Sequence, residues 1–396
     1  MLRFTTAGES HGPALVSILE GAPAGLSLLG EDIDTDLARR QQGYGRGRRM
    51  QIEKDAVDLL SGVRAGQTTG SPIAMLIRNR DWNNWKEVMD PAPNAAGVDP
   101  LRKRAVTRPR PGHADLAGML KYDREDARDI LERASARETT ARVAAGAICR
   151  KLLSEVGVSI GSHVVELGGI AAEWPSNFPA DINAAADASP LRTLDGSAEE
   201  RMIDRIDKAK KDGDTLGGVC EVVCQGLPIG MGSHISWDRK LDGRIAAAMM
   251  SIPAVKGVEI GSGFDAARRP GSEVHDEIVP GDRERSAHTQ RRTNRAGGLE
   301  GGMTNGEPLT VRVAMKPIST LMRPLGTVDM QTGEAASAVA ERSDVTAVPA
   351  MGVIAEAMLA FVLAQAMIEK FGGDSMSELT RNLNGYLAHI ARRRGQ

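Results

Sequence analysis

DARDILERASARETTARVAAGAICRKLLSEV, residues 126–156, is the segment of the chain with the clearest helical pattern. It is rich in alanine, has no proline, and contains Gly146 as its one glycine. Such a composition favours a single long helix. Arg133 and Arg137 are four positions apart, so on a continuous helix they share one face. We therefore predict a helix over residues 126–156 that carries two arginines on one side.

A second segment, TAVPAMGVIAEAMLAFVLAQAM at residues 346–367, is apolar enough to suggest a transmembrane helix. It contains Pro349, Glu356 and Gln365, however, and a carboxylate at the centre of a bilayer costs about 3 kcal/mol. A helix that is hydrophobic on all sides is also typical of the core of a large protein. We predict a buried core helix here and no association with a membrane.

Predicted strands and shorter helices surround these two segments. Residues 14–28 read as two paired strands, ALVSILEG and LSL, joined by a turn at residues 22–25. Further strands are expected at residues 57–61, 73–77, 217–228, 255–260 and 309–317, and helices at 31–41, within 187–211, and at 241–250. Strands that alternate with core helices predict an α+β or layered αβ architecture, and no Rossmann strand order can be read from them.

Composition limits the class of protein. The chain has 396 residues, of which 41% are hydrophobic, so it can build a sizeable core in one large domain or in several smaller ones. Its formal net charge of −2 provides no overall field to hold nucleic acid or an anionic membrane. Three cysteines without a Cys-x-x-Cys pair indicate a reducing compartment, and MLRFTTAGESHG lacks the apolar stretch of a signal peptide. We expect a cytoplasmic protein and, because the histidines are scattered, no metal site.

Two basic segments are candidates for binding an anionic ligand. RRQQGYGRGRR at residues 39–49 has five arginines and no acid. Guanidinium groups match phosphate and carboxylate in two-pronged geometry, and interleaved glycines allow the backbone to approach a ligand closely. A solvated basic loop and a contact to nucleic acid are the alternatives. In RPRPGH at residues 108–113, the prolines hold Arg108, Arg110 and His113 in a stiff extended stretch.

Other short motifs are ambiguous when taken alone. GESHG at residues 8–12 places His11 between glycines, which suits general acid or base work but also fits an exposed loop histidine. Glycine pairs within residues 295–306 can form an anion-binding nest of amides or a flexible hairpin. Asp344 follows Arg342 closely, and an acid beside an arginine is normally an ion-pair partner.

In combination, these motifs resemble chorismate synthases. The following segments occur in the order seen in that family, which extends the resemblance from Arg3 to about Leu379: GESHG (8–12), RRQQGYGRGRRM (39–50), RPRPGHADLAGMLKY (108–122), RASARET (133–139), NRAGGLEGGMTNG (294–306), MKPIST (315–320) and RSDVTAVPA (342–350). The resemblance implies a layered β-α-β sandwich, with long core helices between antiparallel sheets, as one domain over residues 1–396.

The same resemblance implies a reaction. Members of the family convert 5-enolpyruvylshikimate 3-phosphate into chorismate by anti 1,4-elimination of phosphate and a ring hydrogen, the last common step of the shikimate pathway to the aromatic amino acids. They need reduced FMN although the reaction is redox-neutral overall, and NADPH acts as an indirect reductant. The cofactor supplies the electronic chemistry, and the protein supplies orientation and electrostatics.

The resemblance also assigns residues by position. His11 matches the histidine that protonates the departing phosphate, His113 the histidine near the flavin ring, and Asp344 the acid that takes a proton from the flavin. The substrate carries two carboxylates and a phosphate, and its candidate arginines are Arg40, Arg46, Arg49, Arg108 and Arg137, of which the family also assigns Arg40 and Arg46 to NADP. The positions that match flavin-binding residues are Arg133, Ala134, Ser135, Pro253, Ala254, Gly301, Lys316, Pro317, Ile318, Ser319, Thr320 and Arg342.

Several expectations concern the whole molecule. The resemblance implies a homotetramer that receives reduced flavin from a separate flavin reductase. A binding module for RNA or a phosphate ligand is the alternative function, but aromatic residues are only 3% of the chain and no RNA-binding signature is present. Two pairs of similar segments, 8–23 with 301–317 and 133–148 with 341–357, are explained either by chance or by an ancient internal duplication. Residues 380–396 are predicted to form a mobile tail.

Overall fold

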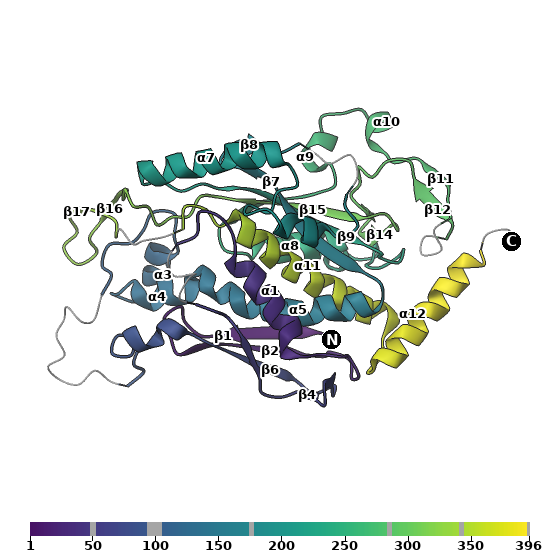
Figure 1. Cartoon of the computed structure of the whole chain (residues 1–396), viewed down its shortest axis with the longest axis horizontal. Helices are drawn as coiled ribbons and strands as arrows, with labels where there is room; N and C mark the ends of the chain where they lie inside the picture. The colour runs from purple at the N-terminus through teal and green to yellow at the C-terminus, as the bar shows by residue number, and fades with distance from the viewer. Residues whose placement is uncertain (48–52, 93–104, 174–177, 283–286, 340–343, 394–396) are drawn as a thin grey trace.

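Two antiparallel sheets lie on opposite sides of a layer of long helices in the computed structural model, which describes residues 1–47, 53–92, 105–173, 178–282, 287–339 and 344–393 (Figure 1). The first sheet has the strand order β1-β2-β6-β3 and the second has the order β10-β15-β9-β7-β8. All neighbouring strands in these two sheets are antiparallel. The predicted α+β sandwich with core helices between antiparallel sheets is confirmed.

The two sheets are built from strands of two to nine residues, and four small hairpins complete the described strands. The sheet strands are β1 (Arg3–Ala7), β2 (Ala14–Glu20), β3 (Val57–Leu59), β6 (Ile73–Arg78), β7 (Ser159–Leu167), β8 (Ile170–Ala171), β9 (Gly218–Gln225), β10 (Val255–Ile260) and β15 (Leu309–Met315). The hairpins are β4 (Val63–Arg64) with β5 (Gln67–Thr68), β11 (Ile278–Pro280) with β12 (Thr289–Arg291), β13 (Leu299–Glu300) with β14 (Met303–Thr304), and β16 (Gly326–Val328) with β17 (Ala335–Ser337).

The helices range from single turns to the 24-residue α11. Their bounds are α1 (Gly30–Gln41), η1 (Arg80–Asn84), α3 (Asp115–Tyr122), α4 (Arg128–Ala134), η3 (Ala136–Glu138), α5 (Thr139–Glu155), α6 (Ile182–Asp187), α7 (Gly196–Asp212), η4 (Trp237–Arg239), α8 (Leu241–Met250), α9 (Gly263–Ala266), α10 (Gly271–Val274), α11 (Val348–Phe371) and α12 (Met376–Ala391). The helices predicted at 31–41 and 241–250 correspond to α1 and α8, and the strands predicted outside residues 14–28 are all present.

Helices α5 and α11 pack against each other at the centre of the sandwich. Helix α5 also contacts β1 and β2 of the first sheet and, to a smaller extent, β7 of the second, whereas α11 contacts β7, β9 and β15 of the second sheet (Figure 1). Gly146 of α5 makes the close approach possible, because a Cβ atom there would lie 2.4 Å from the Cβ of Ala357 on α11. The apolar segment predicted as a core helix is α11. It is long and apolar enough to cross a membrane, but 83% of its most apolar stretch is buried inside the protein.

The helix predicted over residues 126–156 is not continuous. Ser135 is in the extended conformation, with φ −64° and ψ 143°, and its hydroxyl accepts a hydrogen bond from the backbone N–H of Arg137. A serine hydroxyl that bonds to the nearby backbone competes with the helix, so α4 ends at Ala134 and α5 starts at Thr139. The prediction that Arg133 and Arg137 share a helix face is therefore wrong: Arg133 is partly exposed and Arg137 is buried.

The strand pair predicted within residues 14–28 is also wrong. Strand β2 pairs with β1 on one side and with β6 on the other. The segment around Leu26 turns away, because the Leu26 N–H donates to Thr68 Oγ1 at 2.9 Å and Ser27 forms only an isolated bridge with Gln67. The true partner, Arg3–Ala7, precedes the predicted pair in the sequence.

The C-terminal segment from residue 380 is helical as far as Ala391. Ser375 caps the start of α12 by accepting from the Glu378 N–H, and Leu379, Leu383 and Ile390 are buried. The Tyr386 hydroxyl donates to a main-chain carbonyl of the loop after β9 at 3.0 Å. The predicted mobility of this tail remains a prediction.

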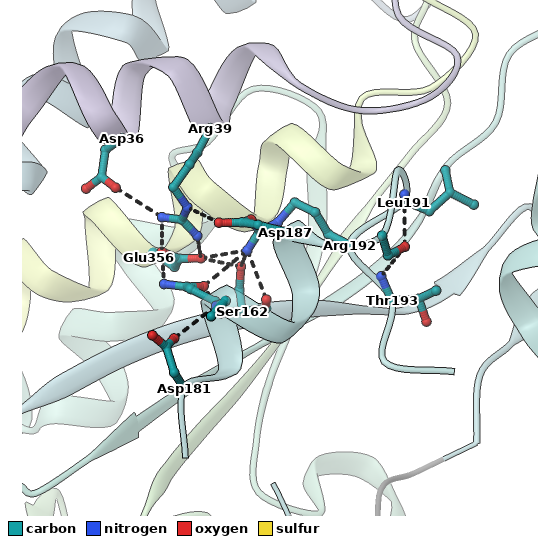
Figure 2. A network of polar contacts seen from close by, with 12 residues as sticks. Asp36, Arg39, Ser162, Asp181, Asp187, Leu191, Arg192, Thr193 and Glu356 are labelled. Atoms are coloured by element: carbon teal, nitrogen blue, oxygen red, sulfur yellow. Dashed lines mark hydrogen bonds and ion pairs between the residues drawn. The ribbon is translucent and has the colours of Figure 1, made fainter. Parts of the chain in front are cut away.

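A buried ionic network joins the helix layer to the second sheet (Figure 2). Glu356 of α11 is 1% exposed and accepts from Arg39 of α1 and Arg150 of α5 at 2.9 Å, from Arg192 at 3.1 Å, and from the Ser162 hydroxyl of β7 at 2.6 Å. Burial raises the pKa of Glu356, but the three guanidinium groups outweigh burial and lower it to about 2. The network fixes the C-terminal end of α1, where a candidate site residue follows directly.

Candidate active site

His11 lies in the loop between β1 and β2 and contacts α4. Its Nδ1 is 2.9 Å from both carboxylate oxygens of Glu132, and its backbone N–H donates to Glu132 Oε2 at 2.9 Å. The neighbouring Ser10 is buried, and its hydroxyl accepts from the Ser135 hydroxyl at 3.1 Å. The imidazole stacks on Trp85, with ring centroids 3.9 Å apart. The structure thus holds this histidine in one orientation at the edge of the first sheet.

Two arginines from distant parts of the sequence converge near this loop. Arg40, at the C-terminal end of α1, donates to Thr139 Oγ1 at 3.0 Å and to the Ala136 carbonyl at 2.9 Å. Arg137 donates from Nη1 to both carboxylate oxygens of Asp55 at 2.7 Å, and Arg40 Nη1 lies 3.8 Å from the same carboxylate. Both arginines are buried, and Asp55 ties them together.

A third arginine and an acid complete this arginine cluster, which consists of Arg40, Arg46, Arg137 and Asp344. Arg46 Nε lies 3.3 Å from Asp344 Oδ2, and the Gly47 N–H donates to Asp344 Oδ1 at 2.5 Å. The charges of Arg46, Arg137 and Asp344 all influence the pKa of Arg40, so we treat the four side chains as one group. Asp344 is an ion-pair partner, as its sequence neighbours suggested, and among the described residues it pairs with Arg46.

The arginine cluster has capacity to bind an anion. Among the described residues, the buried nitrogens Arg40 Nη1 and Arg137 Nη2 have no hydrogen-bond partner; a carboxylate oxygen of Asp55 lies 3.8 Å from the first, and one of Glu53 lies 3.7 Å from the second. Burial is the largest cause that lowers the pKa of Arg40 to about 9; Asp55 opposes this, while Arg137 and Arg46 add to it. Buried polar groups are normally hydrogen-bonded, so the two nitrogens fit a bound phosphate or carboxylate.

Asn79 connects the arginine cluster to the His11 loop. Its Oδ1 accepts from Arg137 Nε at 2.9 Å, while its Nδ2 donates to the carbonyls of Glu9 at 3.2 Å and Gly12 at 2.8 Å. Glu9 and Gly12 flank His11 in the sequence. The histidine and the arginines therefore belong to one constellation that spans β1, α1, η3 and the loop after β6.

His113 belongs to a second group of side chains. Its Nδ1 is 2.5 Å from Asp115 Oδ1, and Arg110 donates to the same carboxylate at 2.8 Å and to Thr320 Oγ1 at 3.0 Å. Burial raises the pKa of Asp115, but hydrogen bonds from His113 and Arg110 outweigh burial and lower it well below its usual range. The ionised Asp115 therefore orients both His113 and Arg110.

Residues 316–320 lie against the His113 turn. The Lys316 ammonium donates to the Gly112 carbonyl, and a Cβ atom at Gly112 would lie only 3.2 Å from Lys316 Nζ. The Lys316 N–H donates to the Ala254 carbonyl at 3.0 Å, which brings the 253–254 turn to the same place. The Lys316 ammonium and the hydroxyls of Ser319 and Thr320 thus lie beside Arg110 and His113, and these groups are suitable donors for a phosphate or a polyol.

A chain of backbone contacts brings the two groups near each other. The Thr215 hydroxyl donates to the Ile318 carbonyl at 2.7 Å. The next residue, Leu216, donates its N–H to the Val345 carbonyl at 2.8 Å, and the Val345 N–H donates to the Gly45 carbonyl at 2.8 Å. Asp344 precedes Val345 and Arg46 follows Gly45 in the sequence. Thr215 and Leu216 therefore connect the 316–320 segment to the arginine cluster.

Not every predicted site residue joins these groups. Arg133 donates to Thr6 Oγ1 at 2.7 Å and to the Gly8 carbonyl at 3.2 Å, so the 133–135 segment lies against the His11 loop. Arg108 is half-exposed and pairs with Asp329, at 3.1 Å, beside the β16–β17 hairpin. Gly301 is in the turn of the β13–β14 hairpin, and Figure 1 shows β14 on the opposite side of the molecule from α3 and α4. Arg49 and Arg342 lie outside the described residues.

Four side chains of the two groups are not identified by the sequence motifs: Glu132, Asp115, Asp55 and Asn79. Glu132 and Asp115 carried weak signals, because Glu132 follows Arg128 by four residues in a helical segment and Asp115 follows His113 by two. Asp55 and Asn79 had no such signal, because they bond to Arg137 only when the ends of β3 and β6 are placed next to η3. Buried acids that orient functional cations are found from the fold.

The fold and the two groups define an α+β sandwich enzyme whose site suits a small polyanion and proton transfer. The sequence model of a family described as chorismate synthase matches residues 2–368. Proteins named chorismate synthase are similar along almost the whole chain: that of Syntrophotalea carbinolica is 58% identical over 391 residues (99% of each chain), and that of Symbiobacterium thermophilum is 59% identical over 395 residues (99% of this chain, 100% of the relative).

A solved structure described as a crystal structure of chorismate synthase is also similar, with a TM-score of 0.79, 46% identity, and coverage of 99% of this chain and 98% of that one. The chain belongs to the chorismate synthase family. The family resemblance inferred from the motifs is confirmed, and the comparisons give no support to an RNA-binding module.

Proposed function

We propose that the chain catalyses the anti 1,4-elimination of phosphate from 5-enolpyruvylshikimate 3-phosphate to give chorismate. The observation that carries the proposal is the arginine cluster beside the His11 loop, where Arg40 Nη1 and Arg137 Nη2 have no hydrogen-bond partner in the described part of the chain. The substrate carries a phosphate and two carboxylates, and guanidinium groups are well matched to both. Membership of the family at 58–59% identity supports the same activity.

His11 is the proposed acid of the reaction. The C–O bond to phosphate breaks, a ring hydrogen leaves as a proton, and a second ring double bond forms. A proton delivered to the leaving phosphate lowers its charge, and general acid catalysis of this kind contributes about 10²–10⁴-fold. Because Nδ1 faces Glu132, the proton exchanged with the phosphate is expected on Nε2.

Reduced FMN is the proposed cofactor, and the 316–320 segment fits such a group. Lys316, Ser319 and Thr320 offer an ammonium and hydroxyls, and the turn before His113 packs so closely on Lys316 that a Cβ at Gly112 would be crowded. When bound, the reduced flavin supplies the transient electron that promotes loss of phosphate. We propose that these residues, with Arg133, Ala134, Ser135, Pro253 and Ala254, hold the flavin, while His113 and Asp344 hold protons on its side of the site.

Phosphate release tests the proposed function. The purified chain is mixed under nitrogen with 5-enolpyruvylshikimate 3-phosphate and chemically reduced FMN, and phosphate and chorismate are both measured. We expect equal amounts of the two products, and no turnover with oxidised FMN. Absence of phosphate release from an enzyme that binds reduced FMN would overturn the proposal.

We further propose a cytoplasmic homotetramer that receives its reduced flavin from a separate reductase, with NADPH as the indirect source of electrons. Family membership supports these points, and Arg40 and Arg46 are the proposed residues for any contact with NADP. An anaerobic assay of the chain with NADPH and oxidised FMN alone tests whether a separate reductase is needed. We expect little flavin reduction, and rapid flavin reduction would contradict the proposal. Sedimentation of the purified protein tests the tetramer.

A further inference from the structure

One buried carboxylate fixes both the backbone and the ring of His11. Both oxygens of Glu132 lie 2.9 Å from His11 Nδ1, and Oε2 also accepts from the His11 backbone N–H at 2.9 Å. The Glu132 main-chain carbonyl accepts from the Ser10 N–H at 3.0 Å. The Glu132 side chain is only 2% exposed. Helix α4 therefore fixes both the backbone of the GESHG loop and the position of the His11 imidazole.

Two neighbouring side chains stabilise this contact. Arg128, one turn earlier on α4, donates from Nη1 to Glu132 Oε1 at 2.9 Å. Trp85 stacks on the His11 ring with an interplanar angle of 25°, and the Arg128 guanidinium carbon lies 5.0 Å from the Trp85 ring centroid. The stacking fixes the plane of the imidazole, and the carboxylate determines which edge of the ring faces α4.

The charge of Glu132 determines the tautomer of His11. Burial raises the pKa of Glu132, but its hydrogen bonds with His11 and the charges of His11 and Arg128 outweigh burial and lower it below the usual value. An ionised carboxylate can only accept hydrogen bonds, so the nitrogen that faces it must carry a proton. The hydrogen bond at one imidazole nitrogen thereby defines the chemistry of the other.

We propose that Glu132 is a positioning residue: it holds His11 in the tautomer with a protonated Nδ1 and so makes Nε2 the atom that exchanges a proton with the ligand. The kinetic consequence rests on the proposed function, because it concerns the elimination. The tautomer itself is a property of the chain without ligand and is tested separately.

The variant Glu132→Gln keeps the shape of the side chain but removes its charge and one of its two acceptor oxygens. Oε1 already accepts from Arg128 Nη1, and Oε2 already accepts from the His11 backbone N–H. An amide has one acceptor oxygen, so in Glu132→Gln its NH₂ group must face one of these two donors. Glu132→Asp keeps both acceptors on a shorter side chain, and partial rescue by this variant is expected.

The chain offers a matched control elsewhere in the fold. Glu221 of β9 is 1% exposed, lies 3.3 Å from His163 Nε2 and accepts from Arg312 Nε at 3.3 Å. The same three residue types thus meet in the second sheet, outside the site. Glu221→Gln carries the same change of a buried carboxylate to an amide and should leave the elimination unaffected.

Two measurements test the proposal. Long-range ¹H–¹⁵N spectra of protein labelled at histidine nitrogens, assigned with His11→Gln, report the tautomer of His11 without substrate or flavin. We expect a protonated Nδ1 in the parent chain and loss of that state in Glu132→Gln. In the elimination assay, we expect Glu132→Gln to lower kcat by about 10–100-fold, with a smaller change in KM, and Glu132→Asp to recover part of it.

Each result of these two measurements either supports or overturns the proposed role of Glu132. A parent chain with an unprotonated Nδ1 overturns the proposal without any variant and without any assay of activity. Equal kcat values for Glu132→Gln and the parent also overturn it, as does an equal loss in Glu221→Gln, which would show a general effect on the fold. A parent chain that shows the expected tautomer but releases no phosphate contradicts the proposed function and leaves the tautomer established.

Discussion

Arg137 shows how one residue links charge to structure in the site. Its Nη1 and Nε bond to Asp55 and Asn79, while the buried Nη2 has no hydrogen-bond partner among the residues that the structure describes. We predict that Arg137→Lys lowers kcat/KM for the elimination by about 10–100-fold, because a compact ammonium cannot keep these bonds and also reach a ligand. Steady-state phosphate release checks this. Arg244→Lys, at an ion pair with Glu369 remote from the site, is the control and should match the parent.

The two site histidines should affect the reaction without affecting flavin binding. We predict that His11→Ala and His113→Ala each lose about 10²–10⁴-fold of elimination activity, the range for a lost acid or base. The affinity for FMN, followed by quenching of its fluorescence, should stay near that of the parent. His389→Ala, on the exposed side of α12, should change neither quantity. Normal turnover of both variants with chemically reduced flavin would contradict the assigned roles.

How far the sequence could predict the site depends on the type of residue. The motifs identified His11, His113, Arg40 and Arg46, because glycines and prolines around them produce unusual local patterns. The acids that orient these groups, such as Glu132, lie in ordinary helical or strand patterns. Their partners are supplied by tertiary contacts, and no local pattern records those contacts.

At the scale of elements, the contact between α5 and α11 depends on a missing side chain. A Cβ at Gly146 would lie 2.4 Å from the Cβ of Ala357 and 2.6 Å from its Cα. We predict that Gly146→Ala lowers the free energy of unfolding by about 1–3 kcal/mol, because overpacking outweighs the gain in helix propensity. Gly385→Ala is the matched control. That glycine is exposed in α12, and apart from its chain neighbours and the backbone of its own helix no described atom lies within 4 Å of its Cβ position, so alanine should stabilise by up to about 1 kcal/mol.

Denaturant titration at one protein concentration measures both glycine variants. If Gly146→Ala were as stable as Gly385→Ala, α5 and α11 could move apart without loss of free energy of unfolding, and the prediction would be wrong. The expectation follows from the close packing of protein interiors, where an added methyl group forces its neighbours to move.

The elements themselves were largely predictable, and the two errors have local causes. The long helices and most strands follow from apolar periodicity and composition. The break at Ser135 was missed because a single hydroxyl bonded to the backbone of Arg137 interrupts an otherwise helical sequence. The strand pairing of residues 14–28 was wrong because the first strand, Arg3–Ala7, competes successfully for β2.

At the scale of the whole molecule, the Glu356 network joins parts that the sequence shows only as isolated oddities. Glu356 is an acid in an apolar helix. Its partners Arg39, Ser162 and Arg192 come from α1, β7 and the segment before α7 (Figure 2), and its partner Arg150 comes from α5. A buried acid with three arginine partners is costly to disrupt, because removal of one charge leaves the others uncompensated. The network thus couples the layers of the sandwich and also holds Arg39 next to Arg40 of the site.

The same network predicts how stability depends on pH. The folded-state pKa of Glu356 is about 2, below the ordinary value of 4.5. Between these two values the unfolded chain binds a proton that the folded chain does not, so stability must fall as the pH decreases through this window. The difference between these two pKa values corresponds to a contribution on the order of 3 kcal/mol. Asp36 in the same network opposes it, because burial raises the pKa of Asp36 and favours its protonation on folding.

We therefore predict that Glu356→Gln is less stable than the parent at neutral pH and that this difference narrows as the pH falls from 4.5 towards 2. Denaturant titrations of both proteins across that window, at one protein concentration, measure the difference. Glu369→Gln removes a partly exposed pair with Arg244 and should differ from the parent by about 0–1 kcal/mol at neutral pH. A gap between parent and Glu356→Gln that stays constant with pH would show that the carboxylate is held by shape and packing, and that its charge contributes nothing to the coupling of the layers.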